Sequence, residues 1–365
     1  MGVPDAGQLP CWEWEDWPAL LANTISWLVE PATQPRPPSP ELLAKMRAEL
    51  LGPGVKKAES HGKAITRYAR IPGGTDSTLT LLKAVSILDG DVPPDLADTV
   101  WDSVRPTLSA AANAVARDLL TGAASAKKSL GLRALGQMQT ADARALLEEA
   151  FKNPDAGGPD DDLEGGMQET ITEDPAVAAV TIRLGALEGL GNLGNPAALP
   201  LLKNAVRQYQ RVMTNPANLA REVTPEDELY HEAVLSALRC GDVSAAAPVV
   251  DMLLENRYVF IRMMSFLDGP DYPGPEHEAT RREKRRIIRE LPRVYRRIAR
   301  LHAKLNSLPS AVLPALAKRI AAEEDHRVAP IAFAIFGANG KPSPDVLAIL
   351  RAAKVPAVRE LANIP

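Results

Sequence analysis

The strongest constraint on the fold of this 365-residue chain is a predicted helix–turn–helix unit over residues 177–205. Leucines recur there at the spacing that places apolar side chains on one face of a helix. The predicted core of the unit is made of Leu187, Leu190, Leu201 and Leu202. One such unit cannot bury both of its faces, so it needs similar units on either side.

The turn of this unit is predicted from its glycines and proline. Gly191 and Gly194 are expected to end the first helix, because glycine adopts left-handed backbone conformations at little cost. Asn195-Pro196 predicts the start of the second helix, since proline is tolerated in the first turn. Small residues, Gly189 among them, predict a close approach between the two helices of this unit.

The neighbouring units are visible as internal repeats. A shift of 55 residues towards the N-terminus, and one of 48 towards the C-terminus, each align leucine and alanine positions with the central unit. The positions that fall on Leu187 and Leu190 are Leu132, Leu135, Leu235 and Leu238. Helical units that repeat in this way stack into a superhelix.

These repeats resemble HEAT repeats, particularly the short bacterial kind related to the repeats of phycobilin lyases. The resemblance covers roughly residues 75–365. It implies an all-α fold, a right-handed α-α superhelix of about five to six helical hairpins, and a tendency to bind other macromolecules. It implies no reaction.

Composition agrees with stacked helices and narrows the function classes. Aromatic residues are only 4% of the chain, and the net charge of −4 argues against a surface wholly dedicated to nucleic acid. Cys11 and Cys240 lie in unrelated contexts and give no disulfide framework. Without a signal peptide or a run as long as a membrane span, we expect a bacterial cytoplasmic protein with no membrane partner.

Residues 1–40 are predicted to differ from the solenoid that follows at 41–365. This segment contains a proline-rich linker and four of the five tryptophans, Trp12, Trp14, Trp17 and Trp27. Its tryptophan and proline pattern resembles the tail of glutamine-amidotransferase-like domains, without a catalytic residue of that family. We expect a helix here that caps the open end of the solenoid; the alternatives are an aromatic platform for a ligand and a remnant of a longer protein.

One acidic stretch interrupts the repeat pattern. Residues 153–175 carry eight carboxylates and no lysine or arginine, which predicts a mobile, solvated acidic insertion. Weak cation binding is the alternative, although the ligand spacing of an EF-hand is missing and no metal site is predicted. Upstream, Ser39-Pro40 predicts a helix that ends at Leu51, and only a turn is predicted in the cationic stretch 54–75.

The most distinctive chemical feature is a cationic helix that ends at Lys304. Residues 281–304 hold eleven lysines and arginines against two glutamates. A helical wheel places one set of cations on one face, opposite apolar residues that include Ile287, Leu301 and Leu305. The candidate partner-binding residues are Arg281, Arg285, Arg289, Arg293, Arg296 and Arg300. Pro292 is expected to kink or divide the helix.

The cationic face admits several interpretations. It can be a solvated face that pairs with the acidic insertion, or a surface for an anionic partner; arginine suits both because it binds carboxylate or phosphate in a bidentate manner. The chain shows no catalytic constellation, so we predict no enzyme activity and no cofactor. The first hypothesis is a non-catalytic scaffold that binds a protein through its helical repeats. The alternatives are a nucleic-acid or polyanion binder, and a lyase or glycosylase of HEAT-like architecture.

Overall fold

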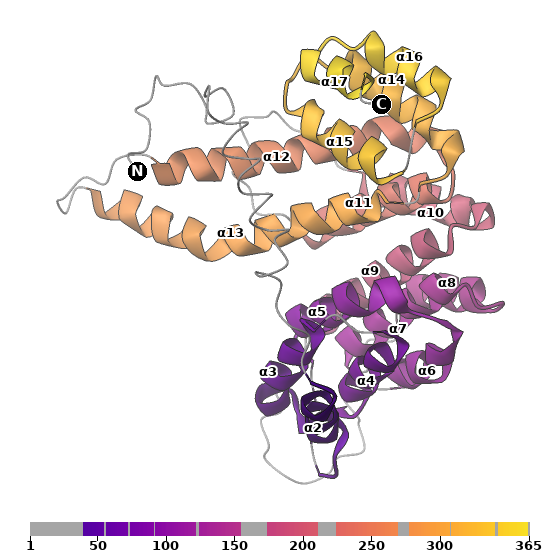
Figure 1. Ribbon diagram of the computed structural model, residues 1–365, viewed down its shortest axis with the longest axis vertical. Helices are drawn as coiled ribbons and strands as arrows, with labels where there is room; N and C mark the ends of the chain where they lie inside the picture. The colour runs from indigo at the N-terminus through magenta and orange to yellow at the C-terminus, as the bar shows by residue number, and fades with distance from the viewer. Residues whose placement is uncertain are drawn as a thin grey trace.

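The computed structural model describes residues 39–54, 56–71, 74–90, 92–121, 124–154, 174–210, 224–268, 277–306, 308–339 and 342–363. Over these ranges the chain is an array of helical hairpins (Figure 1), which confirms the predicted all-α solenoid. The predicted N-terminal helix and most of the acidic insertion lie outside the described residues.

The described helices follow one another in three groups. The first group is α2 (Pro40–Leu51), α3 (Ala58–Ala69), α4 (Thr75–Ser86), α5 (Pro94–Val104) and α6 (Asn113–Thr121). The second is α7 (Ser125–Met138), α8 (Ala143–Lys152), α9 (Pro175–Leu193), α10 (Leu199–Tyr209) and α11 (Pro225–Arg239). The third is α12 (Ala246–Asp268), α13 (Glu278–Lys304), α14 (Leu313–Ala322), α15 (Val328–Ala338), α16 (Pro344–Arg351) and α17 (Pro356–Leu361).

Short elements join some of these helices. Single 3-10 turns occur at Arg105–Thr107, Ala110–Ala112, Pro196–Ala198, Val243–Ala245 and Ser310–Val312. Two short strands, β1 (Lys56–Lys57) and β2 (Leu88–Asp89), pair in parallel. The strand pair ties the start of α3 to the end of α4, a contact that the helical pattern did not predict.

The centre of the molecule is a row of three helices, α7, α9 and α11, with α8 packed on α9 and α10 on α11. The row is tight because glycine removes the side chain at the crossing points. A Cβ added to Gly136 of α7 would collide with the backbone of Gly189 in α9. Gly189 was predicted to bring the two helices of its own unit together, but its closest contacts are with the preceding repeat.

The core of the central unit follows the prediction with two corrections. Leu187, Leu190 and Leu202 are fully buried, whereas Leu201 is only partly buried at the edge of the core. Gly191 does not end the first helix; it lies inside α9, where an added Cβ would come within 2.9 Å of the Ser236 Cβ. Helix α9 ends at Gly194 alone, which adopts a φ of 62°.

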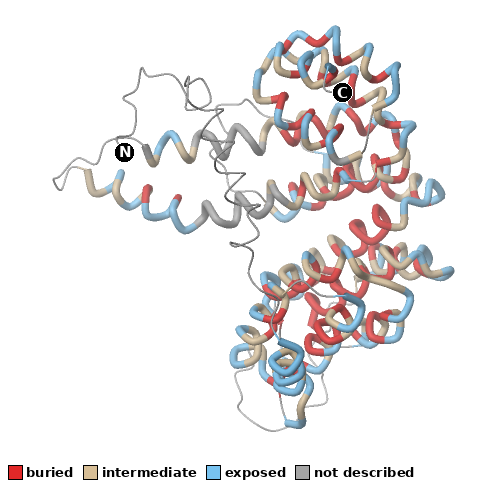
Figure 2. Tube along the Cα trace, in the orientation of Figure 1, coloured by how far each residue is buried: buried red, intermediate tan, exposed pale blue. Residues whose placement is uncertain are grey.

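Helix α9 also differs from the expectation that no run reaches the length of a membrane span. By length and composition it is apolar enough to cross a membrane. Of its most apolar window, 56% is buried inside the protein, between α7 and α11. Its apolarity is thus explained by its central place in the stack (Figure 2).

Helix starts outside the centre agree well with the sequence. Helix α2 spans the predicted residues, with the Ser39 hydroxyl accepting a hydrogen bond from the Leu42 N–H. Helix α11 begins at Pro225 and is capped reciprocally by Thr224 and Asp227. Helix α3, in contrast, falls within the stretch for which only a turn was predicted.

The pair α12 and α13 departs from the compact stack. These two long helices lie side by side, and their far ends project away from the other helices (Figure 1). We call this pair the arm. Within the arm, residues 278–289 of α13 form the distal segment, and residues 300–305 form the root, which lies against the stack.

Candidate interaction surface

Helix α13 is amphipathic, as predicted, over the side chains that the structure describes. Ile287, Leu301 and Leu305 are buried, so the apolar face packs along the helix. Pro292 does not divide α13, which continues from Glu278 to Lys304. The distal segment and the root therefore belong to one continuous helix.

The distal segment exposes most of its arginines. Arg285 donates to Glu278 at 2.8 Å, and Arg281 pairs with the same carboxylate at 3.0 Å. These hydrogen bonds from two guanidinium groups lower the pKa of Glu278. Arg282 and Arg289 are exposed, and neither pairs with a carboxylate among the described residues. The distal segment thus presents more positive charge than its own glutamates neutralise.

The six predicted partner-binding arginines do not share one environment. Arg281, Arg285 and Arg289 lie on the distal segment, where Arg289 donates through Nε to the Arg285 carbonyl at 3.2 Å. The side chains of Arg293 and Arg296 lie outside what the structure describes.

Arg300 is held in the root. Its Nη1 lies 2.5 Å from Asp98 Oδ2, and its Nε lies 3.2 Å from Asp102 Oδ2, so it joins α13 to α5. Neither the acidic insertion nor an external partner is needed to account for this guanidinium. From the sequence, an arginine on this face was expected to pair either with the acidic insertion or with an anionic partner.

Lys304 anchors the root more deeply. Its Nζ lies 3.0 Å from Glu188 Oε2 and 2.6 Å from Glu232 Oε2, and all three side chains are nearly buried. Because Glu188 belongs to α9 and Glu232 to α11, one ammonium group holds α13 against two adjacent repeats. Removal of one member of a buried ion pair strongly destabilises a protein, because the remaining buried charge is left without its partner.

Glu188 is the centre of this ionic network. Trp101 of α5 donates its indole N–H to Glu188 Oε1 at 2.8 Å, and Arg133 of α7 approaches Oε2 at 3.2 Å. Burial alone disfavours the charged carboxylate, but the nearby Lys304 and Arg133 outweigh it and lower the pKa of Glu188 to about 2. Glu188 is therefore ionised at neutral pH despite its burial.

Arg133 extends the network to the first repeats. Its Nη1 donates to Asp98 Oδ1 at 2.7 Å, so Asp98 is shared between Arg133 and Arg300. At Nε the contact with Glu188 does not meet hydrogen-bond geometry, so the attraction there is Coulombic. Five helices (α5, α7, α9, α11 and α13) thus contribute charged or polar groups to one buried network.

This network was missed from the sequence, although a signal was present. The 55-residue shift that aligns the repeats places Arg133 on Glu188, and the 48-residue shift places Glu188 on Ser236. Equivalent positions in stacked repeats lie beside each other. Opposite charges at equivalent positions of apolar helices therefore predict an inter-repeat ion pair.

Two observations on the described residues concern metal binding and the free thiol. Among them, no group of three or more His, Cys, Asp or Glu side chains could hold a metal ion. Burial raises the pKa of the Cys240 thiol to about 11, and its Sγ donates to the Leu190 carbonyl. A thiol in that environment is a poor nucleophile, because the thiolate is the reactive form.

Comparison with known proteins agrees with the helical architecture. The family model of the PBS lyase HEAT-like repeat matches residues 182–208, which cover most of α9, the turn and most of α10. No curated protein and no solved structure matches the chain. The family match lies in the repeats and does not extend to the tryptophan-rich N-terminal segment.

Proposed function

We propose that this HEAT-like repeat protein is a non-catalytic scaffold that binds an acidic segment of a protein partner through the distal segment of its arm. The observation that carries the proposal is the separation of roles along α13. The root is occupied by internal ion pairs, whereas the distal segment exposes cations that the packing of the helix does not require.

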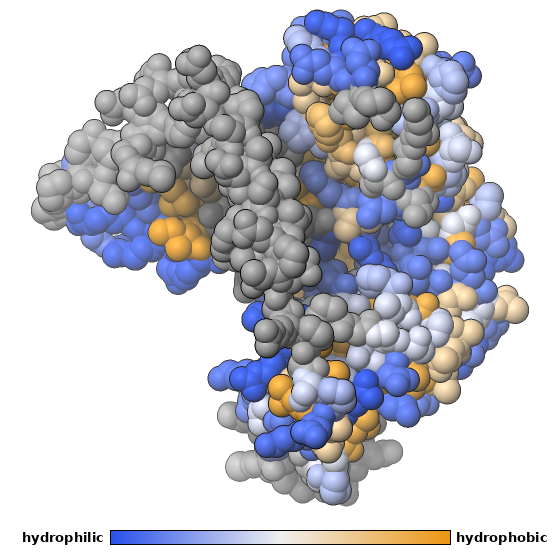
Figure 3. Space-filling model, viewed as in Figure 1, coloured by the Kyte–Doolittle hydropathy of each residue, from blue (hydrophilic) through white to orange (hydrophobic). Residues whose placement is uncertain are grey.

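Exposed apolar groups on the arm favour a protein partner over nucleic acid. Ile288, one turn from Arg285 on the same helix, is 59% exposed, and Phe266 of α12 is 40% exposed. Figure 3 shows a small apolar patch within the hydrophilic surface of the arm. Apolar side chains surrounded by arginines suit an acidic peptide with an apolar anchor, since interface cores are depleted of charge and rims are polar.

The test compares two probes on the full chain. The probes are a labelled peptide that contains leucines between glutamates and a DNA duplex of equal charge. We expect the peptide to bind, and the variant with Arg282, Arg285 and Arg289 all changed to Glu to lose that binding. The change Ile288→Ser should weaken peptide binding about tenfold, as expected for the loss of a buried apolar contact of about 1.4 kcal/mol.

A matched control has three charge reversals elsewhere on the exposed surface, Lys83→Glu, Lys152→Glu and Arg207→Glu. This control should bind the peptide almost like the wild type. Tight DNA binding that is indifferent to Ile288→Ser would contradict the proposal in favour of the polyanion alternative. Peptide binding that survives the distal reversals would remove the arm from the interaction.

A further inference from the structure

Three exposed arginines of the distal segment lie in a line along α13. Arg282, Arg285 and Arg289 follow one another at steps of three and four residues, so they fall within about 60° of one another around the helix. Along the helix axis they are separated by about 4.5 and 6 Å, because an α-helix rises about 1.5 Å per residue. We call these three residues the basic stripe.

An exposed apolar side chain lies beside the basic stripe. Ile288 precedes Arg289 directly and follows Arg285 by three residues, which places it about 60° around the helix from Arg285. Its side chain is 59% exposed, whereas the neighbouring Lys284 and Ile287 are buried. Ile288 therefore lies at the edge of the exposed face of α13, between the basic stripe and the buried side of the helix.

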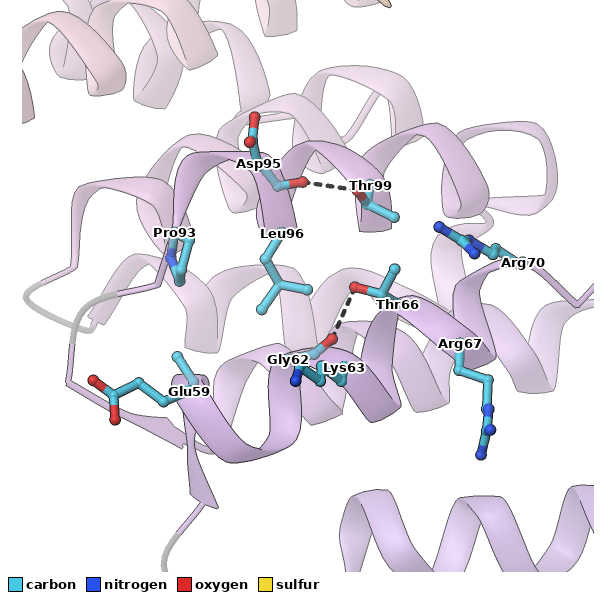
Figure 4. A pocket seen from close by; sticks show the side chains of 11 residues that line it. Glu59, Gly62, Lys63, Thr66, Arg67, Arg70, Pro93, Asp95, Leu96 and Thr99 are labelled. Carbon is cyan, nitrogen blue, oxygen red and sulfur yellow. Dashed lines mark hydrogen bonds between the residues drawn. The ribbon is translucent and has the colours of Figure 1, made fainter. Parts of the chain in front are cut away.

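A second group of cations has the same spacing without the apolar neighbour. These cations border the groove between α3 and α5 (Figure 4) and are Lys63, Arg67 and Arg70. Two carboxylates, from Glu59 and Asp95, line the same groove. Neither α3 nor α5 has a large apolar side chain among those that are exposed. The group on α3 thus shares the charge spacing of the arm but lacks its apolar side chain, which makes it a control.

We propose that the acidic segment bound by the arm is an amphipathic α-helix that lies along α13. Its carboxylates pair with the basic stripe, and an apolar side chain beside them packs on Ile288. This inference rests on the proposed function of the arm and adds the conformation of the partner.

The spacing of the basic stripe matches a helix better than an extended segment. Acidic residues at steps of three and four residues lie about 4.5 and 6 Å apart along a helix, as the arginines do. In an extended segment, residues on one face repeat at about 6.6 Å. Over the three positions of the stripe, the extended segment would therefore be out of register by about 3 Å.

The position of Ile288 favours a helix for a second reason. Because Ile288 and the basic stripe lie at different angles around α13, the partner needs an acidic face and an apolar face next to each other. An amphipathic helix supplies such adjacent faces. In an extended segment, successive side chains point to opposite sides, so glutamates and leucines that alternate cannot both face α13.

The experiment measures binding to the full chain by fluorescence anisotropy, with two labelled peptides of equal composition. Both consist of glutamate, leucine and alanine. In the helical-pattern peptide, glutamates and leucines each recur at steps of three and four residues on adjacent faces; in the alternating peptide, glutamate and leucine alternate. We expect the helical-pattern peptide to bind roughly tenfold more tightly, because its two faces meet the stripe and Ile288 together.

A change within the peptide tests the helix directly. Replacing one central alanine of the helical-pattern peptide by proline leaves its charge unchanged but breaks the helix. Binding should then weaken by roughly tenfold. A side-chain lactam on the face away from the glutamates and leucines holds the helix in place, and it should strengthen binding by lowering the cost of ordering the peptide.

Two matched variants of the protein test the line of arginines. Arg289→Gln removes one cation of the basic stripe. Arg286→Gln removes a cation of the same segment that lies off the stripe, on the side away from Ile288, and that pairs with Glu283. We expect Arg289→Gln to weaken binding of the helical-pattern peptide and Arg286→Gln to leave it nearly unchanged. The control on α3 reverses all three cations of that group, Lys63→Glu, Arg67→Glu and Arg70→Glu, and should also leave binding unchanged.

The outcomes separate this inference from the proposed function. Equal or tighter binding of the alternating peptide, or binding that is indifferent to the proline, would overturn the helical conformation and leave the arm as the interaction surface. If neither peptide binds, the proposed function fails and the inference fails with it. A loss of binding after reversal of the cations on α3 would overturn the assignment of the helix to the basic stripe.

Discussion

The distal segment and the root of α13 carry the same kinds of side chain in opposite surroundings. In the distal segment, Arg285 shares one exposed glutamate of its own helix. In the root, Lys304 reaches carboxylates from two other repeats and is only 11% exposed. The comparison shows that the position of a cation along a helix decides its role as much as its position around the helical wheel.

Ion pairs in the two surroundings contribute differently to stability, because water screens the exposed charges. Exposed ion pairs contribute about 0–1 kcal/mol each, since water screens the charges and the side chains lose freedom. A buried pair costs about 3–5 kcal/mol when one partner is removed. The same substitution at the two ends of α13 should therefore have very different effects, which makes the comparison testable.

The largest effect is expected for Lys304→Met. The change leaves Glu188 and Glu232 buried near each other without the ammonium between them, so the free energy of unfolding should fall by about 3–5 kcal/mol. The distal counterpart, Arg289→Met, should change it by less than about 0.5 kcal/mol. Urea unfolding of both variants measures the difference.

A second substitution sharpens this result. Adding Glu232→Gln to Lys304→Met should restore part of the lost stability, because it removes one of the two carboxylates that have lost the ammonium group. Equal losses in Lys304→Met and Arg289→Met would show that the root is no more important to folding than the distal segment.

The second largest effect is expected from acid, which should weaken the ion pairs that Glu188 forms at the root. Lys304 and Arg133 hold the pKa of Glu188 near 2, below the ordinary glutamate value of 4.5. The network therefore contributes its full stability above about pH 4.5 and loses it as the pH falls towards 2. In Glu188→Gln, this part of the acid sensitivity should be absent. The stability difference between wild type and Glu188→Gln should accordingly shrink over that window.

The exposed Glu278 supplies the control for acid. Hydrogen bonds from Arg281 and Arg285 also lower its pKa, but its side chain is 45% exposed, against 5% for Glu188. The change Glu278→Gln should leave the acid unfolding curve close to that of the wild type. A similar curve for Glu188→Gln and Glu278→Gln would contradict the distinction between the two surroundings.

The smallest measurable effect is expected at the edge of the root. Arg300 is 29% exposed, and Asp98 keeps Arg133 when Arg300 is lost. Arg300→Gln should therefore reduce the free energy of unfolding by about 1–2 kcal/mol, between the buried and exposed limits. The matched variant Arg285→Gln should have almost no effect in the same urea titration. A loss in Arg285→Gln as large as that in Arg300→Gln would contradict this ordering.

The stacked helices could be predicted because each carries local signals. Leucine spacing identified the core residues Leu187 and Leu190, and cap residues such as Ser39 marked helix starts. Helix α3 was missed because it is rich in polar and small residues and buries mainly Ile65 and Tyr68. So few buried positions give little periodic signal, and packing against α5 stabilises the helix instead.

The candidate site also has a part that could be predicted from the sequence and a part that could not. The cationic face of α13 is a property of one helix, so its periodicity was visible. The partners of Arg300 and Lys304 come from positions far away in the sequence, and only the fold brings them together. The alignment of Arg133 with Glu188 at equivalent positions of adjacent repeats is the sequence signal that indicates the buried network.

The root also makes α13 a mechanical lever. About 20 residues separate the distal arginines from Lys304, which corresponds to about 30 Å of helix. A rotation of about 10° at this fulcrum moves the distal end by roughly 5 Å. The fulcrum is bonded to α5, α9 and α11 through Asp98, Glu188 and Glu232. A load applied to the tip is therefore shared among three helices of the stack.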